Sequence, residues 1–89
     1  MWTVSFTQRA RKDLHSLELL IAQRIVSKIE QSASSPERHW EKVVGTQYHK
    51  IRAGDYRALA VLDFQNKIIE VRRAGHRKNI YKQLKKGKI

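Results

Sequence analysis

The sequence predicts an α+β domain in which a strand and a pair of helices precede a small antiparallel sheet. Three observations predict it. Residues 2–6 alternate apolar and polar side chains, residues 8–33 carry apolar side chains at helical spacing, and residues 48–73 hold three strand-like runs separated by turns. We therefore expect one domain, residues 1–89, with its helices on one side of a four-stranded, mainly antiparallel sheet.

The first strand is predicted over residues 2–6. Trp2, Val4 and Phe6 point to one face because side chains two apart in a strand point the same way, and we expect this face to contact the core. Thr7 follows directly. Its hydroxyl can accept a free backbone N–H of the first turn, so it is the predicted cap of a helix that begins at Gln8.

An apolar stripe runs through residues 8–33. Its members recur at steps of three and four residues and include Leu14, Leu17, Ile21, Ile25 and Ile29. One helix of this length would be too long for so small a domain, so the sequence favours two helices with a turn around residues 15–18. The stretch 32–36 ends the second helix, and Pro36 suits the first position of a short turn over residues 36–41.

The second half of the chain changes to strand-like sequence. Runs at 48–52, 56–63 and 67–73 are rich in β-branched, aromatic and aliphatic residues, with hairpin turns predicted at 53–55 and 63–66. Asp63 lies in a turn, where aspartate commonly bonds its own neighbouring backbone. The lysine-rich end, residues 82–89, is predicted to be either a short helix or a disordered basic tail.

Positive charge dominates the composition. Nineteen Lys and Arg face eight Asp and Glu, which gives a formal net charge of +11 and a pI near 10.5. This balance predicts attraction to a polyanion, above all nucleic acid, with an acidic protein as the second candidate. A small domain with a limited core also suits stabilisation by such a partner.

Several classes of protein are disfavoured. The chain has no cysteine, which excludes disulfides and thiolate metal sites. No apolar run approaches the roughly 20 residues of a membrane span, and the N-terminus lacks a signal-peptide core, so we expect a cytoplasmic protein that is not bound to a membrane. The sequence contains no glycine-rich phosphate loop, no nucleophile elbow and no metal-ligand spacing of histidines. We expect no metal and no cofactor, and we expect His15, His39 and His49 to be structural or exposed.

Basic residues cluster around the first predicted hairpin. Lys50 and Arg52 lie two apart in one strand and share a face, and Arg57 stands across the tight turn from Arg52. Gly54 permits the chain to reverse between them. Like charges this close are unfavourable unless they bind something negative, which favours an anion site.

Two motifs point to a known family. The first is Arg-Ala-Gly-Asp-Tyr-Arg at residues 52–57, and the second is Gly-His-Arg…Tyr at residues 75–81. In this order, after a strand and a helical hairpin, they make essentially the whole chain resemble the RelE branch of the RelE/ParE superfamily of toxin–antitoxin toxins. The resemblance implies a RelE-like fold and an mRNA endoribonuclease that cuts in the ribosomal A site without a metal. The 2′-hydroxyl attacks the adjacent phosphate and leaves a 2′,3′-cyclic phosphate.

The resemblance also implies partners. A cognate RelB-like acidic antitoxin would hold the toxin inactive, mRNA on the 70S ribosome would be the substrate, and operator DNA would be reached only through the antitoxin complex. A basic domain suits an acidic, partly disordered partner that wraps it and neutralises its charge.

Site residues follow from the resemblance by position. The catalytic set it implies is Arg57, Arg77, Tyr81 and Lys50, and the RNA-contacting set is Arg52, Arg73, His76, Lys78 and Lys82. Arginines suit the charge that grows on phosphate oxygens because they are permanently charged and donate in a fork. Tyr81, with its pKa lowered by nearby cations, or Lys50 can accept the 2′-hydroxyl proton, and His76 can donate a proton to the leaving 5′-oxygen. The identities of the base and the acid stay open.

Two other functions compete with this interpretation. The ParE branch has a similar fold and poisons DNA gyrase, but its members generally lack the arginine–tyrosine set. A non-catalytic RNA-binding module would need only the charge of the sheet, and Tyr81 would then be dispensable.

Overall fold

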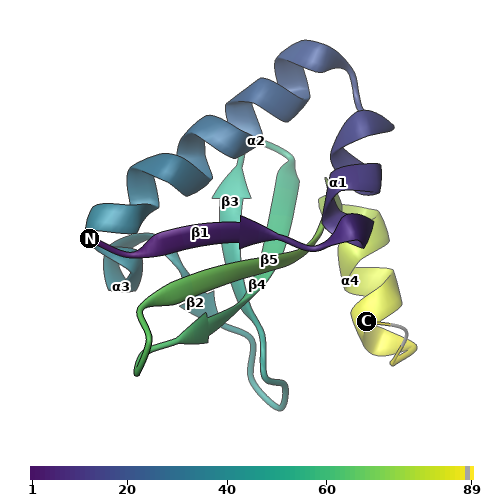
Figure 1. The fold of residues 1–89 in the computed structure, drawn as a ribbon. Helices are drawn as coiled ribbons and strands as arrows, with labels where there is room; N and C mark the ends of the chain where they lie inside the picture. The colour runs from purple at the N-terminus through teal and green to yellow at the C-terminus, as the bar shows by residue number, and fades with distance from the viewer. Residues whose placement is uncertain (88) are drawn as a thin grey trace.

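Residues 1–87 and 89 are described by a computed structural model, shown as a ribbon in Figure 1. Its elements are β1 (Thr3–Phe6), α1 (Gln8–His15), α2 (Leu19–Gln31), a 3₁₀ turn (Ser32–Ser34), α3 (Pro36–His39), β2 (Glu41–Lys42), β3 (His49–Ala53), β4 (Tyr56–Asp63), β5 (Ile68–His76) and α4 (Arg77–Lys85). The predicted α+β class is confirmed.

The described residues form one sheet of five strands in the order β1-β5-β4-β3-β2, so the predicted count of four is wrong by one. The additional strand, β2, pairs only Glu41 and Lys42 with β3, and two residues are too few to show an alternating pattern. β1 runs parallel to β5, with Thr3 opposite Ile68, and the other pairs are antiparallel. β5 also continues to His76 instead of ending near residue 73.

The predicted helical hairpin is confirmed. The hydroxyl of Thr7 accepts a hydrogen bond from the backbone N–H of Ala10 at 3.2 Å, which caps α1. α1 ends at His15 and α2 begins at Leu19, so the chain turns where the sequence predicts. Pro36 opens α3, as expected from its fixed φ and missing N–H.

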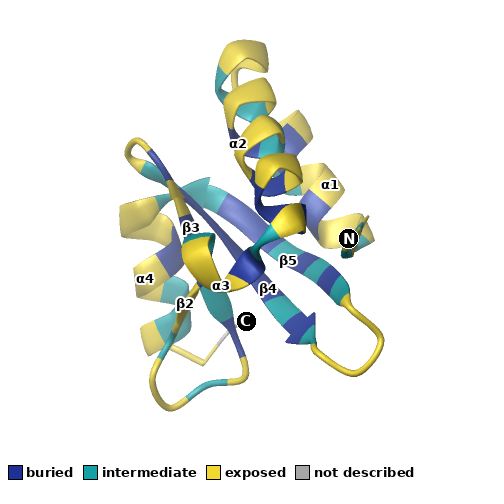
Figure 2. Cartoon of the chain, turned by 90° about the vertical axis from the view of Figure 1, so that its left-hand side faces the viewer, coloured by how far each residue is buried: buried dark blue, intermediate teal, exposed yellow. Residues whose placement is uncertain are grey.

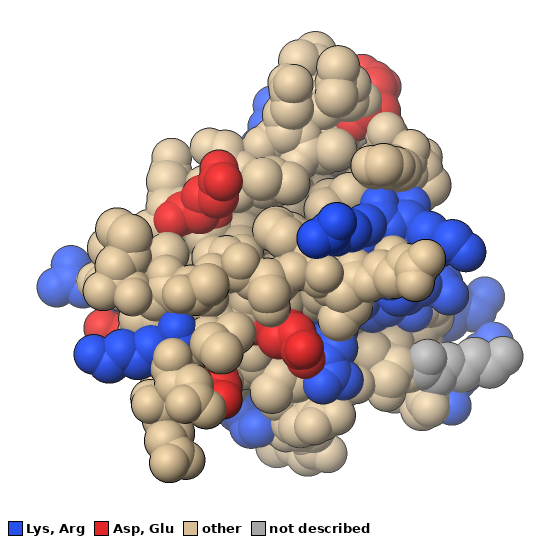
Figure 3. Space-filling view, in the orientation of Figure 1, with Lys and Arg blue, Asp and Glu red and all other residues tan. Residues whose placement is uncertain are grey.

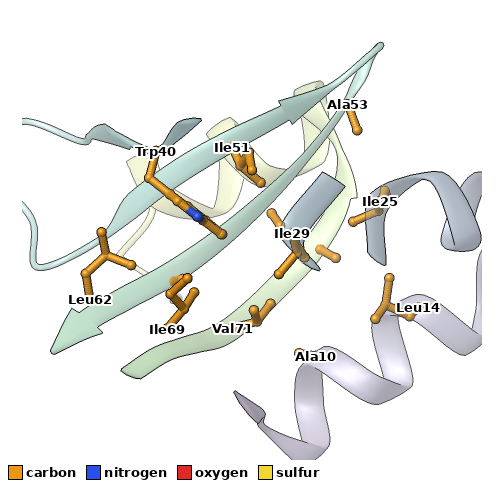
Figure 4. Packing of buried hydrophobic residues seen from close by; sticks show 13 residues of the cluster. Ala10, Leu14, Ile25, Ile29, Trp40, Ile51, Ala53, Leu62, Ile69 and Val71 are labelled. Atoms are coloured by element: carbon orange, nitrogen blue, oxygen red, sulfur yellow. The ribbon is translucent and has the colours of Figure 1, made fainter. Parts of the chain in front are cut away.

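The main core lies between the sheet and the α1–α2 hairpin. Thirteen buried side chains form it, among them Ile25 and Ile29 of α2 and Ile69 and Val71 of β5 (Figure 4). Trp2, Val4 and Phe6 pack against this cluster, which confirms the predicted inner face of β1. Figure 2 shows that burial follows this layering, since β4 and β5 are largely buried while the outward side of α2 and the β4–β5 loop are exposed.

α4 covers the opposite face of the sheet, so the expectation that all helices lie on one side is wrong. Ile80 of α4 is buried against Leu59 and Tyr48, and Leu84 packs on the same cluster. His76 caps this helix, because its Nδ1 accepts a hydrogen bond from the backbone N–H of Lys78 at 3.2 Å. Residues 82–85 of the predicted basic tail are therefore helical, while residue 88 lies outside the described residues.

A buried polar pair fixes the segment that leads into β2. The indole Nε1 of Trp40 donates to the Ser32 hydroxyl at 2.8 Å, and that hydroxyl donates to the carbonyl of Ile29. Both side chains are buried, so each polar group has its partner inside the protein. This pair ties the residues after α3 to the end of α2, which positions the short strand β2.

Asp13 joins α1 to β5. Its Oδ2 accepts hydrogen bonds from Arg73 Nε at 2.7 Å and from the backbone N–H of Ala74 at 3.1 Å, and its Oδ1 accepts one from Arg9 Nε at 3.3 Å. The side chains of Asp13 and Arg73 are only 12% and 11% exposed. The contact lies beside a β-bulge at Leu59/Ala60, where β4 and β5 shift register.

Replacing Asp13 with alanine should lower the free energy of unfolding by about 3 kcal/mol, because it leaves a buried arginine and a backbone N–H without an acceptor. Urea unfolding measures the change. Arg9→Ala is the matched control and should cost less than about 1 kcal/mol, since Arg9 is exposed. Equal losses in the two variants would contradict a special role for the Asp13–Arg73 pair.

Acid should destabilise the fold through His49. Burial, and then the charge of Lys42, hold the pKa of His49 below the usual 6.5. The unfolded chain therefore binds this proton more readily, and stability should fall as the pH drops below about 6.5. Thermal unfolding at pH 7.5 and 5.5 measures the loss of stability on acidification, which should be smaller in His49→Gln than in the original protein. His15→Gln, which removes an exposed histidine, should lose as much stability as the original protein.

Candidate active site

Arg57 is a buried cation without a carboxylate partner among the described residues. The residue is 7% exposed. Its Nη1 donates to the carbonyls of Gly54 at 2.8 Å and Tyr56 at 2.9 Å, and its Nε donates to the Tyr81 hydroxyl at 3.1 Å. Neutral oxygens thus orient the guanidinium and leave its positive charge uncompensated. A permanent charge held in this way attracts an anion strongly.

The β3–β4 hairpin brings further cations to the same place. Gly54 has a φ of +63°, a conformation that side chains disfavour, and it permits a loop of two residues. Arg52 therefore stands directly opposite Arg57, as predicted, and Lys50 lies two residues before Arg52 on the same face. The hairpin concentrates three positive side chains at one end of two strands.

Tyr81 comes from α4, whereas the three cations come from the β3–β4 hairpin. The Lys50 Nζ lies 5.2 Å from the centroid of its ring, and the residue is 38% exposed. Burial raises the pKa of Tyr81, but the hydrogen bond from Arg57 and the charges of Arg57 and Lys50 outweigh it, so the pKa lies below the usual 10.0. The phenolate of Tyr81 is therefore easier to form than that of a free tyrosine.

These side chains line one cavity of about 210 Å³. Its lining residues are His39, Glu41, Lys50, Arg52, Arg57 and Tyr81. Four of the six belong to the sets that the sequence indicated. We call this the cleavage cavity, after the function that we propose for it below.

Sequence reasoning missed Glu41 and His39. Glu41 stands opposite Lys50 in the β2–β3 register, and its Oε1 lies 3.8 Å from Lys50 Nζ. His39, which we expected to be structural or exposed, ends α3 and lines the cavity. No motif marks either residue. Only the pairing of the two-residue strand β2 with β3 would have indicated Glu41.

Arg77 is not among the residues that line the cavity. It is exposed in the first turn of α4, four residues before Tyr81 and so on the same side of the helix. Its backbone N–H donates to the carbonyl of Asp55 at 2.9 Å, which anchors the start of α4 to the β3–β4 turn. His76 caps α4 and packs edge-on against Tyr56, with ring centroids 5.4 Å apart.

The remaining predicted RNA-contacting residues lie elsewhere. Arg73 is buried in its ion pair with Asp13, a structural position far from that expected of a surface RNA contact. Lys78 and Lys82 are exposed on α4, and Lys82 lines a separate small cavity with Asn79, Gln83 and Lys86. The structure therefore unites Lys50, Arg52, Arg57 and Tyr81 and leaves these others outside.

Charge is unevenly spread over the surface. In Figure 3 the Lys and Arg side chains gather on the side of the molecule that holds α1 and α4. Within residues 1–87 and 89, no three His, Asp or Glu side chains group closely enough to bind a metal ion. None of the helices described is long and apolar enough to cross a membrane.

Comparison with known proteins identifies the family of the chain. A family model described as the ParE toxin of the type II toxin–antitoxin system, parDE, matches residues 4–81. No curated protein matches the chain. The fold and the matched family define a toxin of a type II toxin–antitoxin system.

Solved structures refine the class. The chain is 29% identical to a chain of the toxin–antitoxin complex RelBE2 from Mycobacterium tuberculosis, with a TM-score of 0.76 over 85% of this chain and 98% of that one. It is 30% identical to a chain of the RelB–RelE complex from Methanococcus jannaschii, with a TM-score of 0.68 over 88% and 95%. The isolated E. coli RelE toxin, at 21% identity, shares the fold with a TM-score of 0.72 over the full length of both chains. The chain belongs to the RelE/ParE superfamily, as a RelE-type toxin.

Tyr81 should ionise at a lower pH than an ordinary tyrosine. Because the Lys50 charge contributes to this shift, Lys50→Met should move the ionisation of Tyr81 back toward higher pH. NMR titration of ¹³C-labelled tyrosine measures both values, and Tyr81→Phe assigns the signal. An unchanged Tyr81 titration in Lys50→Met would contradict the coupling, and Lys12→Met on α1 controls for the loss of one charge.

Proposed function

We propose that this toxin is an endoribonuclease of the cytoplasm that cleaves mRNA in the A site of the ribosome, without a metal ion. The observation that carries the proposal is the buried Arg57, bonded to a Tyr81 whose ring also contacts Lys50, in a cavity open to an anionic ligand. A binding surface alone would not require a tyrosine whose pKa is lowered inside a cluster of cations.

The proposed reaction is an internal transfer of the phosphoryl group. The 2′-oxygen forms a bond to phosphorus as the bond from phosphorus to the 5′-oxygen breaks, which leaves a 2′,3′-cyclic phosphate and a free 5′-hydroxyl. We assign the 2′-hydroxyl proton to the Tyr81 phenolate. We assign the proton that the 5′-oxygen gains to the Lys50 ammonium. A proton passed from Tyr81 to solvent and back to Lys50 restores both groups.

The cations supply the electrostatic part of catalysis. Arg57 and Arg52 face each other across the hairpin, and both can donate to the non-bridging oxygens of the phosphate as negative charge grows there. Arg77, one turn of α4 before Tyr81, would reach the RNA strand from the solvent side of the cavity. Glu41 would hold Lys50 in place through its ion pair.

A catalytic set with no strong acid–base pair suits an enzyme whose substrate is oriented by another molecule. Fixing the 2′-oxygen in line with the breaking bond can lower a barrier by roughly 7–11 kcal/mol. We assign that role to the ribosome, which would hold the message in the geometry that free RNA rarely adopts.

Cleavage by programmed ribosomes tests this function. With purified protein in excess, Tyr81→Phe should slow single-turnover cleavage by about 10²-fold or more, because it removes the proposed base while keeping the ring. Mapping of mRNA 5′ ends locates the cuts. Arg11→Ala on α1 removes one exposed cation as a control and should retain the rate.

A second function is favoured by the description of the matched family model, which is that of a ParE toxin. In that case the protein would poison DNA gyrase. A supercoiling assay with purified gyrase distinguishes the two, since trapped gyrase together with intact mRNA would support the ParE-like function. If RNA binds but neither effect occurs, and Tyr81→Phe changes nothing, the protein is a non-catalytic RNA-binding module.

We also propose an acidic, RelB-like antitoxin as the partner that keeps the toxin inactive. Several of the similar solved structures are complexes of RelE with RelB. The net charge of +11 favours an acidic chain that follows the surface, with operator DNA reached only through that complex.

A further inference from the structure

A second, larger cavity adjoins the cleavage cavity. It has a volume of about 440 Å³ and lies between α2, α3 and the β3–β4 turn. Its lining residues are Arg24, Lys28, Arg38, His39, Arg52, Ala53 and Gly54. Four permanent or near-permanent cations and one histidine face it, and the lining includes no acidic residue. We call it the flanking cavity.

The cations of the flanking cavity have no charge partner among the described residues. The ion pairs among the described residues involve Arg9, Lys50, Arg72 and Arg73. No described carboxylate oxygen therefore lies within 4.0 Å of any of the four cations that line the flanking cavity. Arg24 and Lys28 stand four residues apart on α2, where like charges repel each other. An arrangement that costs stability in the free protein suggests an anionic ligand.

The geometry of the β3–β4 turn holds this cluster together. An added Cβ at Gly54 would lie 3.8 Å from Arg24 Nη1, so the Arg24 guanidinium lies close to the turn. The carbonyl of the same Gly54 accepts a hydrogen bond from Arg57. One glycine thus stands between the buried arginine of the cleavage cavity and an exposed arginine of the flanking cavity.

The two cavities also share lining residues. His39 and Arg52 belong to both, so positively charged surface continues from one into the other. A single RNA strand carries a phosphate at each nucleotide. When one phosphate lies beside Arg57 and Tyr81, the next phosphates along the strand need a cationic surface adjacent to it, and the flanking cavity is placed there.

We propose that the flanking cavity binds a backbone phosphate of the substrate RNA strand next to the linkage that is cut. This inference rests on the proposed function, since it assumes that the cleavage cavity takes an RNA phosphate. It assigns substrate binding to Arg24, Lys28 and Arg38, which carry no role in the chemistry. Their contacts would be to phosphate and so independent of the base sequence.

Binding of a short RNA that cannot be cleaved tests the proposal. The RNA carries a 2′-deoxy nucleotide at the cleavage position, and fluorescence anisotropy measures its Kd over a range of salt concentrations. The double variant R24Q/K28Q should bind more weakly, and its plot of log K against log salt should be shallower by about 0.7, for one lost phosphate contact to single-stranded nucleic acid. R11Q/K12Q removes the same charge from α1 and should change the slope much less.

A neutral methylphosphonate at one linkage locates the contact. The methylphosphonate is placed in turn at the linkage on the 5′ side and on the 3′ side of the cleavage position. At one of the two it should weaken binding to the original protein about as much as R24Q/K28Q does. At that linkage it should weaken binding to R24Q/K28Q little further. If the methylphosphonate weakens both proteins equally at every position, the flanking cavity does not hold the substrate phosphate. Circular dichroism and urea unfolding establish that both double variants are folded.

Three further results would overturn the proposal. These are equal losses in the two double variants, no binding of free RNA by the original protein at low salt, or a loss in R24Q/K28Q that appears only on ribosomes and therefore reflects ribosomal RNA. Because the RNA is uncleavable, the result does not depend on catalysis. A failure of the cleavage test with Tyr81→Phe can thus be distinguished from a failure of the flanking cavity.

Discussion

The candidate site depends on one constraint, the burial of the Arg57 guanidinium without a counter-charge. A charge inside a protein is costly unless hydrogen bonds replace its water. Here the replacements come from three places: the turn carbonyl of Gly54, the backbone of β4 and the hydroxyl of Tyr81. Each of these must be in position for Arg57 to stay buried, so the hairpin turn and the docking of α4 are coupled through a single side chain.

The two faces of the sheet have different roles, one in stability and one in forming the candidate site. The face under α1 and α2 holds the larger core, closed by the Asp13–Arg73 pair at the β-bulge. The face under α4 has a small cluster built around Ile80 and Leu59 and carries the cleavage cavity. Arginine serves as a structural residue on one face and as a residue of the candidate site on the other. Arg73 is neutralised and structural, whereas Arg57, which lies on the neighbouring strand β4, keeps its charge available.

Much of this arrangement could be predicted from the sequence, and the failures have identifiable causes. The 3.6-residue period of the apolar stripe and the Thr7 cap define α1 and α2 because they are local signals. Lys50, Arg52 and Arg57 could be placed together because a tight turn fixes the register between them. The strand β2 could not be predicted, since two residues carry no period, and Glu41 was missed with it. Arg73 looked like its neighbours in sequence, and only the distant Asp13, sixty residues earlier, distinguishes it.

The parallel pairing of β1 with β5 affects when the candidate site is assembled during folding. β1 can join the sheet only after Ile68, the partner of Thr3, is available, and Arg57 lacks the Tyr81 hydroxyl until α4 has formed. Contacts so distant along the chain form late, because the loop between them must first be closed. A nascent chain therefore lacks the assembled cluster while most of it is still being synthesised. If ribosomes are the target of this protein, the ribosome that synthesises it is spared until α4 has emerged.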